Sequence, residues 1–347
     1  MGHAHPKVVA AVQLQASKLM SCHSSMFNDA RSLFLEKLIS IAPGGLDRIF
    51  LSNSGAEAVE AAIKIARKAT GRRQIVAMKG GFHGKTHGAL SATWDRKYRK
   101  SFEPLVPDFD HVSFGDVEAA KKAITKNTAA VLVEPVQGEG GVRVPPQDWL
   151  ALLRELSRES GSLLIMDEVQ SGLGRTGKLF ASDHFEVTPD ILCLGKGLAS
   201  GLPIGVTMAS DSIMATLSMG EHTTTFGGNP VVSAAGAATI DALTEEHLVE
   251  NSKIVGGYFR SELVRLASSR PIVREIRGLG LMIGAEMRFD VLNTLQRAMG
   301  RGVLMLDAGR NVVRFLPPLC LDRGNVDKII AVLGEVLEEE ELARIPA

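Results

Sequence analysis

Aromatic residues, cysteines and an excess of either charge are what this sequence has least of. Aromatic residues make up 5% of its 347 residues, and 39 basic side chains are matched by 39 acidic ones, so the formal net charge is zero. Without a basic excess, nothing in the composition favours nucleic acid or an anionic membrane surface as a partner. The three cysteines (Cys22, Cys193 and Cys320) are scattered, which argues against a disulfide framework and against a zinc site.

Long apolar runs are absent as well. No run reaches the length of a transmembrane helix, and the first residues do not follow the pattern of a signal peptide. We therefore predict a soluble protein of a reducing, cytoplasmic compartment. What the chain does have is enough length for a full core, and 35 glycines, which suit turns and close approaches of the backbone.

Short apolar runs alternate with helical segments through the first two thirds of the chain. The runs cover residues 48–51, 74–78, 129–133, 162–166 and 190–194. This alternation is typical of βαβ units, so we predict the α/β class with a mainly parallel sheet.

The C-terminal part has a different pattern. An Ala-rich helix predicted over residues 231–243 leads towards strands near 281–286 and 312–315 and a final helix over 325–340. We predict a large domain at residues 21–240 and a smaller α+β domain at residues 241–347, to which residues 1–20 also belong.

Two of the apolar runs end in opposite charges. The run at 162–166 stops at Asp167, and the run at 190–194 stops at Gly195 and Lys196. In parallel sheets, ligands bind just beyond the carboxyl ends of the strands. An amine and a carboxylate presented there fit pyridoxal 5'-phosphate (PLP) chemistry, in which a lysine forms a Schiff base and an aspartate pairs with the pyridinium nitrogen. A buried structural ion pair is an equally good interpretation of these two strands alone.

A helix start follows the run at 48–51. Ser54 and Glu57 have the spacing of a capping box, and Gly55 and Ala56 leave the first helix amides uncovered. Such a terminus can bind a phosphate, although most capped helices bind nothing.

Residues 79–86 come close to a nucleotide-binding P-loop. Lys79 stands where the first glycine of that motif belongs, so the loop is instead a glycine-rich turn that carries Phe82 and Lys85. A metal site is not predicted, because glycines interrupt the helix that two histidines four residues apart would need.

Charged residues also mark two other strands. The run at 129–133 is followed by Glu134 and Glu139 among glycines, and Arg314 lies within an otherwise apolar strand. A structural salt bridge is the default explanation for Arg314, and binding of a substrate carboxylate is the more specific alternative.

Taken together, seven short stretches resemble the class III (acetylornithine- and ornithine-type) aminotransferases, which are PLP enzymes of fold type I. The resemblance covers nearly the whole chain. In chain order the stretches are 52–58 (Ser-Asn-Ser-Gly-Ala-Glu-Ala), 80–86 (Gly-Gly-Phe-His-Gly-Lys-Thr), 134–141 (Glu-Pro-Val-Gln-Gly-Glu-Gly-Gly), 167–177 (Asp-Glu-Val-Gln-Ser-Gly-Leu-Gly-Arg-Thr-Gly), 194–197 (Leu-Gly-Lys-Gly), 224–230 (Thr-Thr-Phe-Gly-Gly-Asn-Pro) and 314–319 (Arg-Phe-Leu-Pro-Pro-Leu).

The resemblance implies roles around the cofactor ring. Lys196 would be the Schiff-base lysine and the acid and base of the proton shift, and Asp167 would keep the ring nitrogen protonated. Val169 and Phe82 would sandwich the ring, and Gln170 would reach its phenolic oxygen.

The resemblance also implies how the phosphate is held. The backbone amides of Gly55 and Ala56 would bind it, and Thr225 would reach the phosphate of the partner subunit's cofactor. This predicts a homodimer with shared active sites.

For the substrates, Arg314 would bind the α-carboxylate of glutamate or 2-oxoglutarate, and Glu139 would pair with Arg314 while the other substrate is bound. Glu134 would support the same region. Lys85 stands where many relatives have an arginine that grips a second carboxylate, so the charge is kept and the bidentate fork is lost.

The implied activity is transfer of the terminal amino group of an acylated diamino acid to 2-oxoglutarate, in arginine or lysine biosynthesis. N-acetylornithine is the first expectation, and lysine or ornithine linked to an amino-group carrier protein is the second. A basic patch (Arg96, Lys97, Arg99 and Lys100) would suit an acidic carrier, and a solvated helix face explains it as well.

Ornithine or 4-aminobutyrate transamination, an aminomutase and a catalytically silent PLP-binding protein remain alternatives. Relatives carry some tens of residues before the motif found here at residues 2–6, so the resemblance implies that the family's N-terminal segment is missing.

Overall fold

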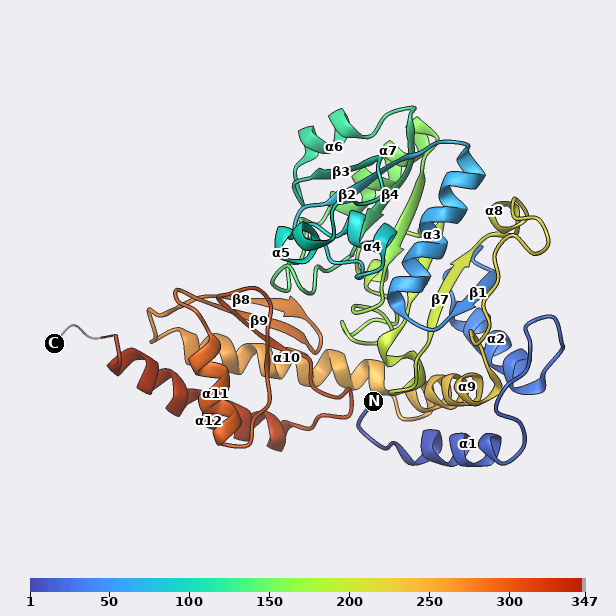
Figure 1. Cartoon of the computed structure of the whole chain (residues 1–347). Helices are drawn as coiled ribbons and strands as arrows, with labels where there is room; N and C mark the ends of the chain where they lie inside the picture. The colour runs from blue at the N-terminus through green and yellow to red at the C-terminus, as the bar shows by residue number, and fades with distance from the viewer. Residues whose placement is uncertain (345–347) are drawn as a thin grey trace.

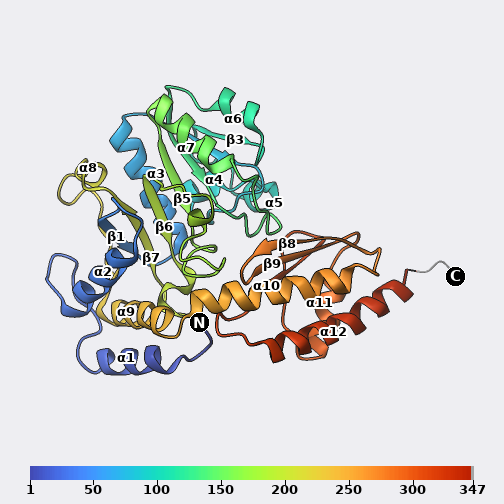
Figure 2. The same cartoon turned by 180° about the vertical axis from the view of Figure 1, so that it is seen from behind.

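The computed structural model describes residues 1–344 and contains two β-sheets (Figures 1 and 2). The larger sheet has seven strands in the order β1-β7-β6-β5-β4-β2-β3. Its strands are β1 (Arg48–Ser52), β2 (Gln74–Met78), β3 (Phe109–Val112), β4 (Thr128–Val133), β5 (Leu163–Asp167), β6 (Ile191–Leu194) and β7 (Gly205–Ala209). The five neighbouring strands from β3 to β6 pair in parallel, and β7 pairs antiparallel with both β6 and β1. The predicted mainly parallel sheet is confirmed.

Helices cover both faces of this sheet, which explains why its central strands are apolar without alternation. Ile75 and Ala77 of β2 pack into the core under α3 (Gly55–Thr70). Val76 and Met78 of the same strand pack into the opposite core, which contains residues of α7 (Trp149–Ser160). Shorter helices complete this part: α4 (His87–Ala92), α5 (Arg96–Arg99), α6 (Val117–Ala123), α8 (Asp211–Met214), η1 (Lys100–Phe102), η2 (Ala181–His184) and η3 (Lys196–Ala199).

The smaller sheet is antiparallel, with the strand order β10-β11-β9-β8. The strands are β8 (Val273–Leu279), β9 (Met282–Met287), β10 (Leu306–Asp307) and β11 (Val312–Phe315). Its helices are α10 (Leu248–Ala267), α11 (Leu292–Gly300) and α12 (Arg323–Leu342), and α10 packs against β8 and β9 (Figure 1).

The path between the two sheets differs from our expectation. The Ala-rich helix α9 (Pro230–Glu245) does not lead into the second part but packs against α1 (Pro6–Ala16) and α2 (Asp29–Ile41) (Figure 2). The following helix, α10, makes the passage instead. Because α9 has small side chains, α1 and α2 can approach it closely. The limits that we predicted for the two domains stay a prediction.

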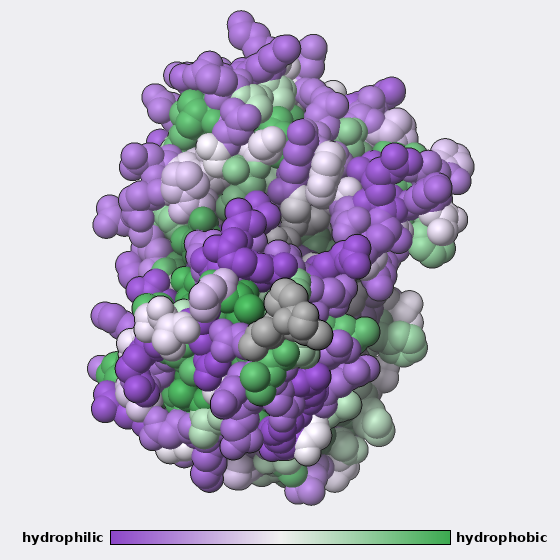
Figure 3. Space-filling view, turned by 90° about the vertical axis from the view of Figure 1, so that its left-hand side faces the viewer, coloured by the Kyte–Doolittle hydropathy of each residue, from purple (hydrophilic) through white to green (hydrophobic). Residues whose placement is uncertain are grey.

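The surface that carries the smaller sheet and α12 is mostly hydrophilic, with hydrophobic residues in small groups (Figure 3). Within residues 1–344, no helix combines the length and the apolar character needed to cross a membrane.

Candidate active site

The candidate site lies at the carboxyl ends of β4, β5 and β6, which are neighbours in the larger sheet. The register pairs Val133 with Met166 and Asp167 with Cys193, so Glu134, Asp167 and Lys196 follow adjacent strand ends. This is the edge at which ligands bind in parallel sheets.

Asp167 is buried and held on both of its oxygens. Its Oδ1 accepts a hydrogen bond from the Val169 N–H at 3.1 Å, and its Oδ2 pairs with Nδ1 of His83 at 2.8 Å. Burial alone disfavours a charged His83, but its hydrogen bond to Asp167 and the charge of Asp167 outweigh burial and raise the pKa of His83. The four-residue spacing of His83 and His87 raises only the question of a metal site, and nothing near His83 in the sequence signals a partner 84 positions away.

Lys196 opens the one-turn helix η3 in the left-handed region, with φ of +42°. A non-glycine residue in that region stores strain, which is typical of functional sites. Its side chain is exposed to the adjoining cavity, with protein on its other sides. This protein surface removes part of the water around the amine and lowers the pKa of Lys196, while the negative charges of Asp167, Glu134 and Glu139 oppose the effect.

The start of α3 lies directly beside Lys196. Ser54 Oγ accepts a hydrogen bond from the Glu57 N–H at 3.2 Å, which is the first half of the predicted capping box. The second half is different, because Glu57 accepts from the backbone of Asn53 at 2.9 Å and not from Ser54. The N–H groups of Gly55 and Ala56 donate to no acceptor within residues 1–344. Unpaired N–H groups at a helix N-terminus are able to bind an anion.

Gly55 is required for this packing. A Cβ at this position would lie 2.5 Å from Cγ1 of Val169, so only glycine lets the helix start approach the strand end. Gly195 also lies close to Gly55, because a Cβ at Gly195 would come within 3.3 Å of the Gly55 Cα. The lysine, the carboxylate and the open helix amides are thus locked together by close backbone contacts.

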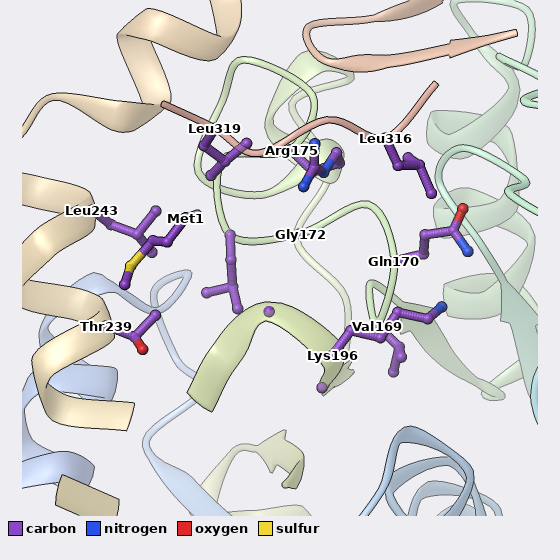
Figure 4. Close-up of a pocket in the computed structure, with 13 residues that line it drawn as sticks. Met1, Val169, Gln170, Gly172, Arg175, Lys196, Thr239, Leu243, Leu316 and Leu319 are labelled. Carbon is purple, nitrogen blue, oxygen red and sulfur yellow. The ribbon is translucent and has the colours of Figure 1, made fainter. Parts of the chain in front are cut away.

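A cavity of about 110 Å³ adjoins Lys196. Figure 4 shows Lys196, Val169 and Gln170 on one side of it, with Met1, Thr239 and Leu243 on the other and Arg175 above. The cavity therefore joins the strand ends of the larger sheet to the N-terminal residues and α9.

A second hollow of about 590 Å³ opens next to Phe82 and Glu139. The Phe82 ring packs edge to face against the Tyr98 ring, with 5.3 Å between the ring centroids. The backbone N–H of Phe82 donates to Oε1 of Glu134 at 2.9 Å. Oε2 of Glu134 accepts from the Gly138 N–H at 3.1 Å. Burial of Glu134 raises the pKa of its carboxyl group. Glu134 thus fixes both the aromatic loop and the loop that carries Glu139.

Arg314 connects the smaller sheet to this site. It is 6% exposed, and its Nη1 donates to Oε1 of Glu139 at 2.6 Å and to Oε1 of Gln170 at 3.1 Å. Arg314 Nε has no partner within the described residues. The structure therefore brings Arg314, Glu139 and Gln170 together.

Two predicted site residues lie apart from that group. The exposed Lys85 places its Nζ 5.3 Å from the centroid of the Tyr98 ring. Thr225 is exposed, and the preceding residue, Thr224, accepts a hydrogen bond from the Asn53 side chain at 3.4 Å. Within residues 1–344, neither side chain forms a hydrogen bond or an ion pair with Arg314 or Glu139.

The family model of class III aminotransferases matches residues 1–337. The chain belongs to this family. Class III aminotransferases are PLP-dependent transaminases, so PLP is the cofactor of this aminotransferase.

Similar proteins agree with this assignment. The aminotransferase is 45% identical to an acetylornithine aminotransferase of Methanopyrus kandleri, over 97% of this chain and 86% of that protein. It is also 45% identical to a [LysW]-aminoadipate semialdehyde transaminase of Deinococcus radiodurans, over 97% of this chain and 79% of that protein. The crystal structure of ornithine aminotransferase from Toxoplasma gondii ME49 superposes with a TM-score of 0.95 at 35% identity, covering 99% of this chain and 84% of that one. The fold predicted from the resemblance is confirmed.

The residues of this aminotransferase fit PLP chemically. A lysine with a lowered pKa and a buried carboxylate follow neighbouring strands, and the open amides of α3 offer a phosphate site beside them.

Proposed function

We propose that this aminotransferase transfers the terminal amino group of an acylated diamino acid to 2-oxoglutarate, giving a semialdehyde and glutamate. N-acetylornithine and a carrier-protein-linked lysine or ornithine precursor are the donor candidates, in arginine or lysine biosynthesis in the cytoplasm. The observation that carries the proposal is the buried Arg314, whose charge is met by the half-buried Glu139 beside the Lys196 site. The names of the similar proteins support the donor class.

Four side chains at the strand ends and in the loops of the larger sheet would serve the cofactor ring. Bound PLP supplies a protonated ring that withdraws electrons from the substrate carbon next to the transferred nitrogen. Asp167 would keep the proton on the ring nitrogen, and His83 would hold the Asp167 carboxylate in place. Val169 and Phe82 would enclose the ring from its two faces.

Lys196 would hold the cofactor covalently and, once released, would take the proton from the substrate carbon that carries the amino group and deliver it to the cofactor carbon bonded to the same nitrogen. Its lowered pKa supports this role, because the neutral amine is the form that attacks and that accepts a proton. Gln170 would reach the phenolic oxygen, and the amides of Gly55 and Ala56 would bind the phosphate.

The Arg314–Glu139 pair would let one pocket accept two kinds of substrate. While the donor presents its uncharged tail, Glu139 would neutralise Arg314, because an unpaired buried guanidinium is costly. When 2-oxoglutarate binds, its carboxylate would replace Glu139. Lys85 would contribute charge near the entrance, and Glu134 would hold the surrounding loops.

A homodimer would complete the site through Thr225. Two segments beside α2 expose large apolar side chains, Phe27 and Phe226. Arg31 joins these segments, because it donates to the carbonyls of Cys22 and Met26 and to that of Gly228. Exposed apolar patches commonly mark association surfaces. Their position next to Thr225 supports a shared site.

The test is a donor panel assayed with 2-oxoglutarate. We expect the highest kcat/KM with N-acetylornithine or a carrier-linked donor, and weaker turnover of ornithine, lysine and 4-aminobutyrate. If glutamate is formed but no acylated donor is preferred over ornithine, the result would favour an ornithine aminotransferase. That function is named for several structural relatives. Turnover without 2-oxoglutarate would contradict the proposal and indicate an aminomutase.

A further inference from the structure

The loop of residues 138–142, here called the Glu139 loop, lies between the two sheets. Its base is closed by Gln137 and Arg143, whose backbones exchange two hydrogen bonds of 3.0 Å. On the larger-sheet side, Glu134 accepts from the Gly138 N–H. The loop is therefore anchored at its first residue independently of Glu139.

On the smaller-sheet side, the Glu139 loop lies on a single cross-strand row. The register pairs Arg277 of β8 with Gly284 of β9, and Gly284 with Arg314 of β11. Directly paired residues of antiparallel strands project to the same face, so both arginines lie on one face with Gly284 between them. From the strand spacing, the two Cα atoms are roughly 10 Å apart.

The loop fits this row residue by residue. Glu139 contacts Arg314 at one end, and the Gly141 carbonyl accepts from Arg277 Nε at 2.8 Å at the other end. Between them, Val142 lies over Gly284, where a Cβ would come within 3.0 Å of the Val142 Cβ and 3.3 Å of the Gly141 oxygen. Gly284 thus provides the space into which the loop packs.

Arg277 is held in place by its own strand and the next one. Its Nη1 donates to Glu275 at 2.7 Å and to Glu286 at 2.6 Å, and the Arg277 and Glu286 side chains are each 13% exposed. A lysine has no planar fork with which to reach a carboxylate and a carbonyl at the same time.

We propose that Arg277 is a positioning residue that fixes the Glu139 loop against the smaller sheet and thereby sets how well Glu139 covers Arg314. This inference rests on the proposed exchange of Glu139 for a substrate carboxylate. The bond from Arg277 goes to the backbone, so it persists when the Glu139 side chain leaves Arg314. Arg277 therefore favours the donor half-reaction, which needs the covered Arg314, over the acceptor half-reaction.

The experiment measures the two half-reactions separately, by the absorbance change of the bound cofactor with donor alone and with 2-oxoglutarate alone. For Arg277→Gln we expect donor kcat/KM to fall about tenfold, and kcat/KM for 2-oxoglutarate to stay within about twofold, because only the donor needs Glu139 in place.

Arg274→Gln is the matched control. Arg274 lies on the same strand and donates to the same Glu286 at 3.0 Å, but it makes no hydrogen bond to the Glu139 loop. We expect both half-reactions to be unchanged in this variant. Equal losses in Arg274→Gln and Arg277→Gln would overturn the proposal, because then the charge, and not the bond to Gly141, matters.

A double-mutant cycle with Glu139→Gln gives the decisive readout. If Arg277 acts through Glu139, Arg277→Gln has no further effect on the donor half-reaction once Glu139 is replaced. Additive losses would overturn the proposal. Gly284→Ala, which displaces the loop from the other side, should reproduce the selective donor loss and serves if Arg277→Gln fails to fold.

The outcomes also separate this inference from the proposed function. A wild-type enzyme that does not use 2-oxoglutarate would overturn both. A wild-type enzyme that uses it, combined with equal losses in both half-reactions of Arg277→Gln, would overturn only the role of Arg277.

Discussion

The two sides of the site hold their carboxylates in opposite ways. At the strand ends of the larger sheet, backbone N–H groups and His83 hold Glu134, Asp167 and Glu168. Arginine side chains of the smaller sheet hold Glu286, on the same sheet, and Glu139, on the loop that follows β4. Backbone partners cannot move away, whereas an ion pair can be exchanged for a substrate carboxylate. We call the strand ends of the larger sheet, where these carboxylates would stay in place around the cofactor, the fixed side. We call the arginine-held part, where a substrate carboxylate would replace Glu139, the exchangeable side.

The largest effect should come from Lys196→Ala on the fixed side. We expect turnover to fall by at least about 10⁴-fold, because one residue supplies both the nucleophile and the acid–base group. Borohydride reduction followed by mass spectrometry should trap no cofactor adduct. Lys178→Ala removes an exposed lysine whose Nζ donates to the Asp183 carbonyl at 2.8 Å, and this control variant should keep both properties. A cofactor adduct that persists in Lys196→Ala would show that another residue binds the cofactor covalently, and it would contradict the place of Lys196 on the fixed side.

Asp167→Asn keeps the shape of the side chain and removes its charge. We expect kcat to fall by about 10³-fold in both half-reactions alike, because the loss is of electrostatic stabilisation at the ring. Circular dichroism should show an unchanged fold. A loss confined to one half-reaction would mean that this carboxylate belongs to the exchangeable side.

Glu168 gives the fixed side a pH signature. Its oxygens accept from the N–H groups of Ala181 and Ser182 at 2.6 and 2.8 Å, and burial raises the pKa of Glu168 to about 7. Between the ordinary value of 4.5 and about 7, the folded state binds more protons than the unfolded state. The Glu168 contribution to the free energy of unfolding therefore decreases as pH rises through this window, by about 3 kcal/mol in total.

Denaturant unfolding of the wild type and of Glu168→Gln at several pH values checks this sign. The difference between the two proteins should change across that window and be flat above it. A difference that is constant from pH 4.5 to 7 would show that Glu168 binds equally many protons in the folded and unfolded states, so that burial does not raise its pKa.

Arg314→Lys tests the exchangeable side. The KM for 2-oxoglutarate should rise about 30-fold, because an ammonium group cannot replace the paired hydrogen bonds of the guanidinium. The donor half-reaction should change less, since Lys keeps a charge that Glu139 can cover. Steady-state kinetics with each substrate varied in turn distinguishes the two. Equal changes would place Arg314 outside carboxylate recognition.

Lys85→Arg should have the smallest effect, a change in any KM of about twofold or less. Lys85 is exposed and lies over the Tyr98 ring, and exposed charges contribute little. A fall in the KM for one substrate of tenfold or more would show that position 85 reaches that substrate in the assembled enzyme.

The sequence predicts the fixed side better than the exchangeable side. Strands such as β2 and β5 follow from their apolar runs, and their final charges give Asp167 and Lys196 directly. The strand β8 was missed, because Arg274, Glu275 and Arg277 interrupt its apolar pattern. Among them, Arg277 donates to Glu286 and to the Gly141 carbonyl of the Glu139 loop, so a residue that holds the substrate side also interrupts the apolar pattern from which β8 would be predicted.

Local residue spacing also gives no prediction of contacts between side chains that are far apart in the sequence. The contact of Arg314 with Glu139 spans 175 positions and was expected only from the family resemblance. His83 pairs with Asp167 across 84 positions, and its neighbourhood in the sequence gives no hint of a buried partner. Local spacing identifies strand ends, but not which side chains meet across them.

The cross-strand row Arg277–Gly284–Arg314 makes the hydrogen-bonding register of the smaller sheet part of substrate choice. A slip of β9 by a single position would turn its side chains to the opposite face and place a methyl group or larger under Val142. The short connection between β8 and β9, which fixes this register, would then influence substrate specificity as strongly as a residue that lines the pocket. An insertion there should alter which amines are accepted while the coenzyme stays bound.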